Sequence, residues 1–285
     1  MAGCAGGVPM RGMILGVLAA CALTTAQAEP ADTLVIGNDL AEIVDRLDGT
    51  SRLLGRDDSS RYPQTIASLP SVGYMRQLSA EGVLALKPQR LLISDAARPV
   101  LVLRQLRGLG LDVVSIARGK VVGDIPAKIE QVAAAMNRQA QAQPLLDEQR
   151  RLAGQLARTP ALKGPKALFI FNHAGMTPLI MGRGTEAQAA LEQAGIENCA
   201  TFSAYKQVAA EAMVTLAPDF VIVSTAGLAA LGGEDSLWKL GGLAHTPAGQ
   251  HRRLVQVDDQ ALLNLGPRTV QAMLQLRQDA GALFP

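Results

Sequence analysis

The sequence predicts an α/β protein made of two lobes with parallel sheets, joined by a long α-helix. Short apolar stretches alternate with helical stretches through most of the chain, which is typical of parallel sheets covered by helices. A helix–strand pattern at 73–94 returns at 206–224 with a fixed offset, so that Gln77 corresponds to Gln207 and Ser94 to Ser224. This internal repeat indicates two lobes of one design.

The segment between the two copies differs in composition and predicts the helical linker. It is rich in Ala, Gln, Glu and Arg, with apolar residues at helical spacing. Pro144 lies inside it, and because a proline in a helix interior costs about 3 kcal/mol, we expect a kink or break near Gln143. The expected domains are a leader at 1–28, an N-terminal lobe at 29–122, the linker helix at 123–160 and a C-terminal lobe at 161–285.

In the N-terminal lobe, apolar runs and capping residues set the expected elements. Asp39 is placed to cap the first helix, Ser79 to cap the helix that carries Glu81, and Gly110 to close another helix. We expect strands at 33–36, 52–55, 90–93 and 112–116, helices at 40–47 and 100–109 and between Ser79 and Lys87, and an extended loop at 56–69.

The C-terminal lobe repeats this alternation. The loop after its first strand, 172–178, carries a histidine, and a Gly-rich connection at 227–245 carries the one tryptophan. We expect strands at 167–171, 220–223 and 254–257, and helices at 185–194, 211–216 and 269–280. Ligands of such sheets lie beyond the carboxyl ends of the strands, which here means the facing edges of the two lobes.

Residues 1–28 have the pattern of a secretory signal peptide. Arg11 is followed by an apolar run over 13–23, and Ala26-Gln27-Ala28 has the small residues of a cleavage site. The run is too short to span a bilayer. The favoured interpretation is a soluble exported protein. The alternatives are a lipoprotein anchored through Cys21 and a buried N-terminal helix.

Charge and cysteine content exclude several classes of function. The chain has a net charge of +2, and removal of the leader takes one positive charge with it. This near-neutral balance predicts no nucleic-acid partner and no polybasic membrane patch. Only Cys199 remains after cleavage, which excludes an intrachain disulfide and a cysteine-based metal site.

Three stretches carry a resemblance to a known family. The sequence VGYMRQLSAEG at 72–82, the run WKLGGLAHTPAG at 238–249 and VDDQALL at 257–263 are similar to periplasmic haem-binding proteins of bacterial haem ABC importers. These belong to the helical-linker (class III) substrate-binding proteins, whose other members bind ferric siderophores and cobalamin. The resemblance implies two Rossmann-like lobes, a periplasmic location, capture of ferric haem between the lobes, and delivery to an inner-membrane ABC permease. An outer-membrane haem receptor would act upstream.

The resemblance implies that Tyr74 is the axial ligand of ferric haem, and therefore the metal-binding residue. A phenolate is a hard anionic oxygen that suits Fe(III), and tyrosine is a known haem ligand. A free phenol ionises only near pH ~10, so the iron and the neighbouring cation of Arg76 would have to favour the phenolate. The alternative is an ordinary loop tyrosine, and Tyr62 and Tyr205 are rival ligands outside the motif.

The second lobe offers weaker candidates. His173 ends a strand near the expected cleft and is the candidate second ligand, with a plain loop histidine as the equal alternative. Some relatives carry an arginine at the position near Ala226, where this chain has no cation. Arg183 and Lys206 are the candidate replacements. Other candidate haem contacts are the soft side chains of Met75, Met176 and Met181, together with Arg76 and Tyr205.

Glu81 and Glu211 occupy equivalent positions in the repeat. The resemblance implies that one glutamate on each lobe pairs with arginines of the permease. The alternative is local, because an acidic residue in the first turn of a helix stabilises it by about 0.3–1 kcal/mol.

Three other functions compete with haem transport. A carrier of a siderophore or of cobalamin would use the same scaffold. An exported haem-processing enzyme is less favoured, because the chain has no Ser-His-Asp order, no His-x-x-x-His spacing and no Gly-rich phosphate loop before a helix. A structural interaction module would bind no small ligand at all.

Overall fold

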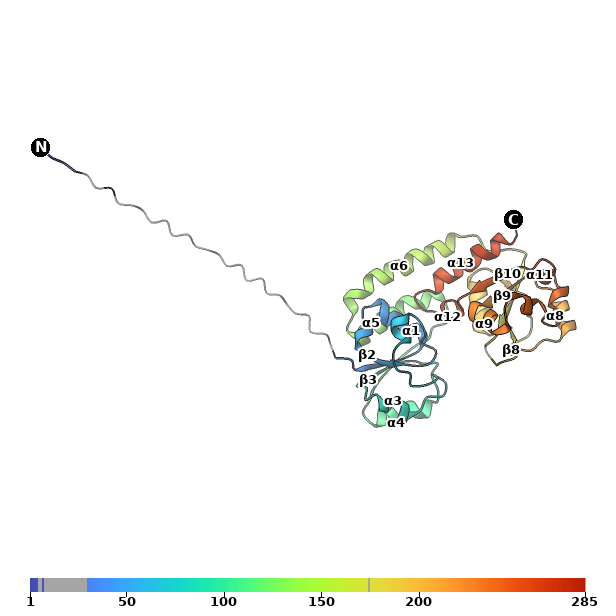
Figure 1. Ribbon diagram of the computed structural model, residues 1–285, viewed down its shortest axis with the longest axis horizontal. Helices are drawn as coiled ribbons and strands as arrows, with labels where there is room; N and C mark the ends of the chain where they lie inside the picture. The colour runs from blue at the N-terminus through green and yellow to red at the C-terminus, as the bar shows by residue number, and fades with distance from the viewer. Residues whose placement is uncertain (5–6, 8–29, 174, 285) are drawn as a thin grey trace.

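The computed structural model describes residues 1–4, 7, 30–173 and 175–284. The predicted cleavage site and Cys21 lie outside these residues. The two-lobed α/β architecture is confirmed: each lobe is built on its own sheet, and α6 and α13 lie along one side of the molecule (Figure 1). No helix in the described part of the chain is long and apolar enough to cross a membrane.

The N-terminal lobe has a four-stranded, fully parallel sheet in the order β2-β1-β3-β4. Alternate residues of the central strands face different cores: Val35 and Leu92 pack toward α1 and α5, whereas Leu34 and Leu91 pack toward α3 and α4. The strands are β1 (Thr33–Ile36), β2 (Leu53–Arg56), β3 (Arg90–Ser94) and β4 (Asp112–Ile116).

The helices of this lobe include one that the sequence did not predict, because α2 lies inside the stretch expected to be an extended loop. The Ser79 side chain caps α3 by accepting a hydrogen bond from the Gly82 N–H at 3.0 Å, as expected. The helices are α1 (Asn38–Arg46), α2 (Gln64–Ala67), α3 (Ala80–Ala85) and α4 (Val100–Gly108), with 3-10 turns η1 (Thr50–Arg52) and η2 (Val122–Asp124).

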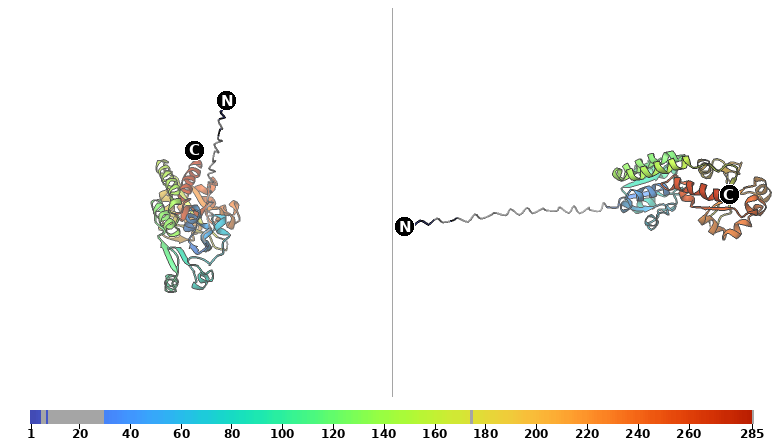
Figure 2. Two further views of the ribbon diagram at one scale, coloured as in Figure 1. Left: turned by 90° about the vertical axis from the view of Figure 1, so that its left-hand side faces the viewer. Right: turned by 90° about the horizontal axis from the view of Figure 1, so that it is seen from above.

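The linker is two helices rather than one, which corrects the sequence prediction. α5 (Ile125–Met136) ends at Asn137, which has the left-handed conformation (φ 55, ψ 43) that asparagine tolerates better than most residues. α6 (Gln139–Arg158) then runs from the N-terminal lobe toward the C-terminal lobe (Figure 2). The expected break near Gln143 is absent, since Pro144 lies close to the start of α6 and removes one backbone donor without ending the helix.

The C-terminal sheet has the order β10-β9-β5-β6-β8 with β7 beside β5, and its pairs are parallel only among β10, β9, β5 and β7. β6 and β8 extend it with antiparallel pairing, a feature that the predicted all-parallel sheet lacks. The strands are β5 (Lys166–Phe171), β6 (Leu179–Met181), β7 (Glu197–Asn198), β8 (Tyr205–Lys206), β9 (Phe220–Ser224) and β10 (Leu254–Val257).

The helices of the C-terminal lobe fill much of the predicted Gly-rich connection. The repeat is visible in the structure, because α8 and β9 follow one another as α3 and β3 do in the first lobe. The helices are α7 (Glu186–Gln193), α8 (Ala210–Leu216), α9 (Thr225–Leu231), α10 (Glu234–Trp238), η3 (Leu243–His245), α11 (Pro247–Gln250), α12 (Asp259–Leu263) and α13 (Thr269–Ala282).

One hydrophobic core extends through both lobes and the linker. It joins Val35 of β1, Ile129 of α5, Leu152 of α6, Phe169 of β5 and Met273 of α13. Because α6 and α13 pack against each other within this core, the lobes are held by a continuous packed layer rather than by a thin hinge.

Buried charges reinforce the contact between the lobes. Lys128 of α5 forms an ion pair with Asp39 of α1 and also donates a hydrogen bond to the Leu265 carbonyl at 3.1 Å. Arg268, just before α13, donates to Glu42 of α1 at 2.6 Å. Asp39 is therefore not the cap of the first helix: Gly37 occupies that position, and the Asp39 carboxylate faces Lys128.

Candidate functional site

A pocket of about 160 Å³ lies between the lobes, at the edge that the carboxyl ends of the strands share. We call it the inter-lobe cleft. Among the predicted site residues it brings together Arg76, Met181 and Tyr205. Its lining is Arg76 and Arg118 from the N-terminal lobe and Phe171, Met181, Glu186, Tyr205, Asp259, Gln260, Leu263 and Asn264 from the C-terminal lobe.

The loop that carries Tyr74 is fixed by backbone hydrogen bonds. Gly73 has φ +93, a conformation that residues with a side chain rarely adopt. Its carbonyl accepts a hydrogen bond from the Asp58 N–H at 3.0 Å, and its own N–H donates to the Ser71 hydroxyl at 3.1 Å. The glycine thus allows the sharp turn that precedes the tyrosine.

Tyr74 itself is 44% exposed, and its hydroxyl has no hydrogen-bond partner in the described part of the chain. The next residues are anchored, since the Arg98 N–H donates to the Met75 carbonyl at 2.9 Å. Two positions after Tyr74, Arg76 lines the cleft. The structure therefore holds an unengaged phenol on a fixed loop, two residues before the lining residue Arg76, and Tyr74 is not itself part of the 160 Å³ lining.

The rival tyrosines are engaged elsewhere. The Tyr205 hydroxyl donates a hydrogen bond to Glu186 at 2.5 Å. Burial, together with this neighbouring carboxylate, raises the pKa of Tyr205, so that its phenolate is strongly disfavoured. The Tyr62 ring lies under the guanidinium of Arg268, 3.8 Å from the ring centroid. Neither arrangement suits an iron ligand.

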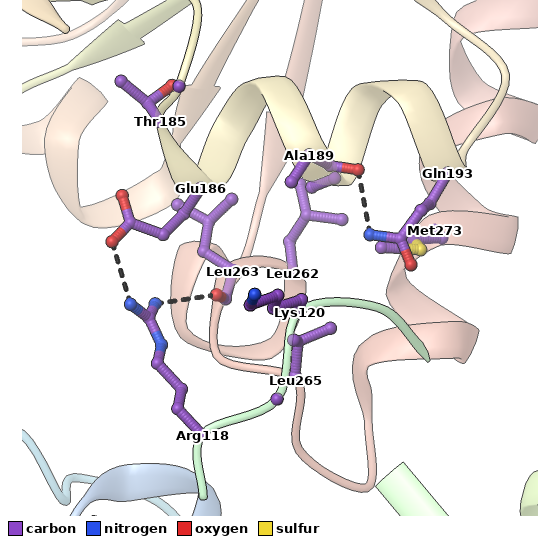
Figure 3. Close-up of a pocket in the computed structure, with 13 residues that line it drawn as sticks. Arg118, Lys120, Thr185, Glu186, Ala189, Gln193, Leu262, Leu263, Leu265 and Met273 are labelled. Atoms are coloured by element: carbon purple, nitrogen blue, oxygen red, sulfur yellow. Dashed lines mark hydrogen bonds and ion pairs between the residues drawn. The ribbon is translucent and has the colours of Figure 1, made fainter. Parts of the chain in front are cut away.

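Two of the residues that line the cleft, one from each lobe, form an ion pair. Arg118, two residues beyond β4, donates to Glu186 of α7 at 3.0 Å and to the Leu263 carbonyl at 3.4 Å (Figure 3). Burial opposes ionisation of Glu186, but the hydrogen bonds from Tyr205, from its own backbone N–H and from Arg118 lower the pKa of Glu186 to about 2. The pair is thus fully charged and ties the two lobes together.

The low pKa of Glu186 gives a testable dependence of stability on pH. The folded-state value of about 2 lies below the ordinary 4.5, so the ionised carboxylate contributes stability that is complete above 4.5 and is lost as the pH falls toward 2. Urea unfolding of the wild type and of Glu186→Gln should therefore give free energies of unfolding that differ most at neutral pH and converge in acid. A difference that stays constant with pH would contradict this account.

His173 lies two residues beyond β5 and is exposed. Its ring packs edge-on against Phe171 with centroids 4.6 Å apart, and Phe171 in turn packs against Tyr205 at 5.9 Å. Burial raises the pKa of the Asp259 carboxyl, while the charge of the nearby His173 acts to lower it. His173 does not itself line the cleft, although it contacts Phe171, which does, and it lies near the Asp259 carboxyl.

The three methionines are placed differently. Met181 is almost fully buried and lines the cleft, whereas Met176 is 52% exposed in the loop after His173. Met75 is half-buried, and its sulfur accepts a hydrogen bond from the Ser59 hydroxyl at 3.7 Å. Only Met181 is thus part of the cleft lining.

The candidate replacements for the missing cation lie outside the cleft lining. Arg183 is exposed, and its backbone N–H donates to the Phe202 carbonyl at 2.7 Å. The Lys206 ammonium lies 5.4 Å from the centroid of the Phe202 ring. Ala226 is exposed on α9. Neither candidate lines the pocket around Arg76.

Sequence reasoning missed Arg118, Glu186 and Asp259. Two of them had a usable signal, because Arg118 and Asp259 each lie two residues beyond the carboxyl end of a parallel strand. Glu186 is the first residue of α7, and no pattern in the sequence indicated a role for it. In the described residues no group of three or more His, Cys, Asp or Glu side chains could hold a bare metal ion.

Glu81 and Glu211 are both exposed, each at the second position of its helix. Their helices, α3 and α8, lie on different lobes, α3 at the end far from α6 and α8 at the outer end of the C-terminal lobe (Figure 1). Neither carboxylate has a partner among the described side chains, so both are available to a partner protein.

Two α/β lobes, a helical connection and a cleft lined from both sides define a ligand-binding protein of the clamp type. Residues 34–261 match the family described as Periplasmic binding protein, and the chain belongs to this family. By its description, the members of this family are binding proteins.

Two solved structures and one curated relative are similar to this chain over most of its length. The periplasmic heme-binding protein BhuT in complex with two hemes has 35% identity and a TM-score of 0.82, covering 89% of this chain and 99% of BhuT. Apo RhuT of Roseiflexus sp. RS-1, another periplasmic heme-binding protein, has 31% identity and a TM-score of 0.82, covering 90% and 99%. The uncharacterized ABC transporter substrate-binding lipoprotein YvrC of Bacillus subtilis is 24% identical, covering 92% and 82%.

Proposed function

We propose that this protein captures ferric haem in the inter-lobe cleft and delivers it to an inner-membrane ABC permease. Tyr74 carries the proposal: an exposed phenol without a partner stands on a fixed loop, two residues from a guanidinium that lines the cleft. Similarity to two periplasmic heme-binding proteins over nearly their full length supports haem over other cargo. The protein acts as a carrier and not as an enzyme.

In this proposal Tyr74 binds the ferric iron as phenolate, and Arg76 favours the charged form of the phenol. The iron supplies the remaining positive charge. His173, with Asp259 nearby, is the group on the opposite lobe that can reach a second axial position or a second porphyrin. The buried sulfur of Met181 provides a soft apolar contact in the cleft.

An absorption titration tests the choice of cargo. Purified protein is titrated with ferric haem, cobalamin and a ferric siderophore, and the expected result is saturable binding of haem with a high-spin, tyrosinate-type spectrum. If cobalamin or the siderophore binds saturably and haem gives no such spectrum, the cargo is that ligand and not haem. Turnover of bound haem in the presence of a reductant would instead indicate an enzyme.

The sequence pattern of the leader and the family support a periplasmic location. We propose that residues 1–28 direct export and that the mature protein acts in the periplasm, with an outer-membrane haem receptor as the upstream source. The lipoprotein alternative through Cys21 has support in the lipoprotein YvrC. Mass spectrometry of the mature protein separates the two, since cleavage after Ala28 leaves Glu29 as the N-terminus and lipidation leaves a modified Cys21.

Docking to the permease gives a further prediction. If Glu81 and Glu211 pair with arginines, each lost pair costs about 2 kcal/mol, so Glu81→Ala with Glu211→Ala should lower haem transport at least about tenfold. Uptake into vesicles that contain the permease measures this, and the haem affinity should not change. Glu130→Ala with Glu197→Ala is the control, since these exposed carboxylates lie elsewhere. Full transport by the first double variant would rule out the docking role.

A further inference from the structure

The inter-lobe cleft contains a second guanidinium that the repeat and the motif did not predict. Arg76 and Arg118 both line it, although they come from different segments of the N-terminal lobe. Arg76 is exposed and donates no hydrogen bond to another described residue. A site with two guanidinium groups is suited to a ligand that carries carboxylates, because each guanidinium can bind a carboxylate through two parallel hydrogen bonds.

Arg118 can exchange its present partner for a ligand carboxylate and remain paired. It holds Glu186 at 3.0 Å through one nitrogen, and its second contact, with the Leu263 carbonyl, is long at 3.4 Å. When Arg118 leaves, Glu186 keeps the Tyr205 hydroxyl at 2.5 Å. A ligand carboxylate would take the place of a protein carboxylate, so the guanidinium is not left unpaired in the cleft.

The same exchange enlarges the site. Arg118 and Glu186 line the cleft and also a neighbouring pocket of about 260 Å³, in which Figure 3 shows their ion pair. The cleft alone is smaller than the roughly 300–1,000 Å³ usual for ligand sites, and the two volumes together fall within that range. Because Arg118 and Glu186 line both pockets, a bulky ligand that occupies the two volumes would displace their ion pair.

We propose that Arg118 binds a propionate carboxylate of the porphyrin, and that it provides the cation which the C-terminal lobe lacks near Ala226. This proposal rests on the proposed function. It makes Arg118 a specificity residue, because a tetrapyrrole whose propionates are esterified offers the guanidinium no negative partner. Arg183 and Lys206 are not needed for this role, since neither lines the cleft.

The test compares ferric haem with its dimethyl ester by absorption titration. The wild type should bind haem about tenfold more tightly than the ester, and Arg118→Gln should lose about tenfold in haem affinity while its affinity for the ester stays the same. Arg104→Gln, an exposed arginine on α4, is the matched control and should behave as the wild type. If Arg118→Gln loses affinity equally for haem and for the ester, or loses no affinity for haem, the proposal is overturned.

A second variant is expected to raise the haem affinity. A rise cannot be explained by misfolding, whereas a loss in the first variant could be. Glu186→Gln releases Arg118 from its carboxylate, so haem affinity should rise severalfold while ester affinity stays constant. A fall in haem affinity would overturn the role of Arg118. If the wild type binds neither haem nor the ester, the proposed function fails, which is distinct from a wild type that binds haem without any contribution from Arg118.

Discussion

Replacement of Tyr74 by phenylalanine is expected to weaken the binding of ferric haem by about 100-fold or more and to abolish the tyrosinate-type spectrum. Even the loss of a group outside the first coordination shell typically costs 10–100-fold in metal affinity, and removal of the ligand itself should cost at least the upper value. The phenylalanine ring keeps the shape of the side chain. Because the Tyr74 hydroxyl has no partner in the described structure, the free energy of unfolding should stay unchanged.

Tyr62→Phe is the matched control for this experiment. Tyr62 is 46% exposed, close to the 44% of Tyr74, and it lies on the same lobe outside the cleft lining. The control should bind haem like the wild type. If Tyr74→Phe has the spectrum and affinity of the wild type, Tyr74 is not the ligand, and His173 becomes the next residue to substitute.

The largest expected effect on stability comes from the buried ion pair between α1 and α5. Asp39→Ala should lower the free energy of unfolding by about 3–5 kcal/mol, because Lys128 is left buried with only the Leu265 carbonyl as partner. The Lys128 and Asp39 side chains are 2% and 7% exposed, so water cannot replace the lost carboxylate. Urea unfolding followed by circular dichroism measures the change.

Two variants show whether the cost comes from the unpaired charge. Asp147→Asn breaks an exposed pair with Arg150 on α6 and should change stability by less than about 1 kcal/mol. Asp39→Leu combined with Lys128→Met removes both buried charges and should recover much of the loss of Asp39→Ala. A loss below about 1 kcal/mol in Asp39→Ala would show that the pair does not hold α1 and α5 together.

The parts of the fold that could be predicted are those with a strong local pattern. The apolar run of β1 and the repeated units α3–β3 and α8–β9 appear where the sequence placed them. The antiparallel strands β6 and β8 were missed because three and two residues are too few to show a periodicity. The linker break was assigned to Pro144, whereas the structure places it at Asn137, where the left-handed conformation turns the chain.

The candidate site was predictable in its local features and not in its contacts between the lobes. The Ser79 cap of α3, just after the loop of Tyr74, follows from neighbouring residues, and the structure agrees with it. The contact of Arg118 with Glu186 joins segments from different lobes, so no local pattern could reveal it. Asp39 shows the same limit, since its partner Lys128 lies on the linker.

Anomalous diffraction at the iron absorption edge, from crystals of the protein with ferric haem, tests the central claim most directly. The expected result is an iron peak in the inter-lobe cleft, within bonding distance of the Tyr74 hydroxyl oxygen. An iron peak on the outer surface, or one bonded to His173 with Tyr74 remote from it, would contradict the account.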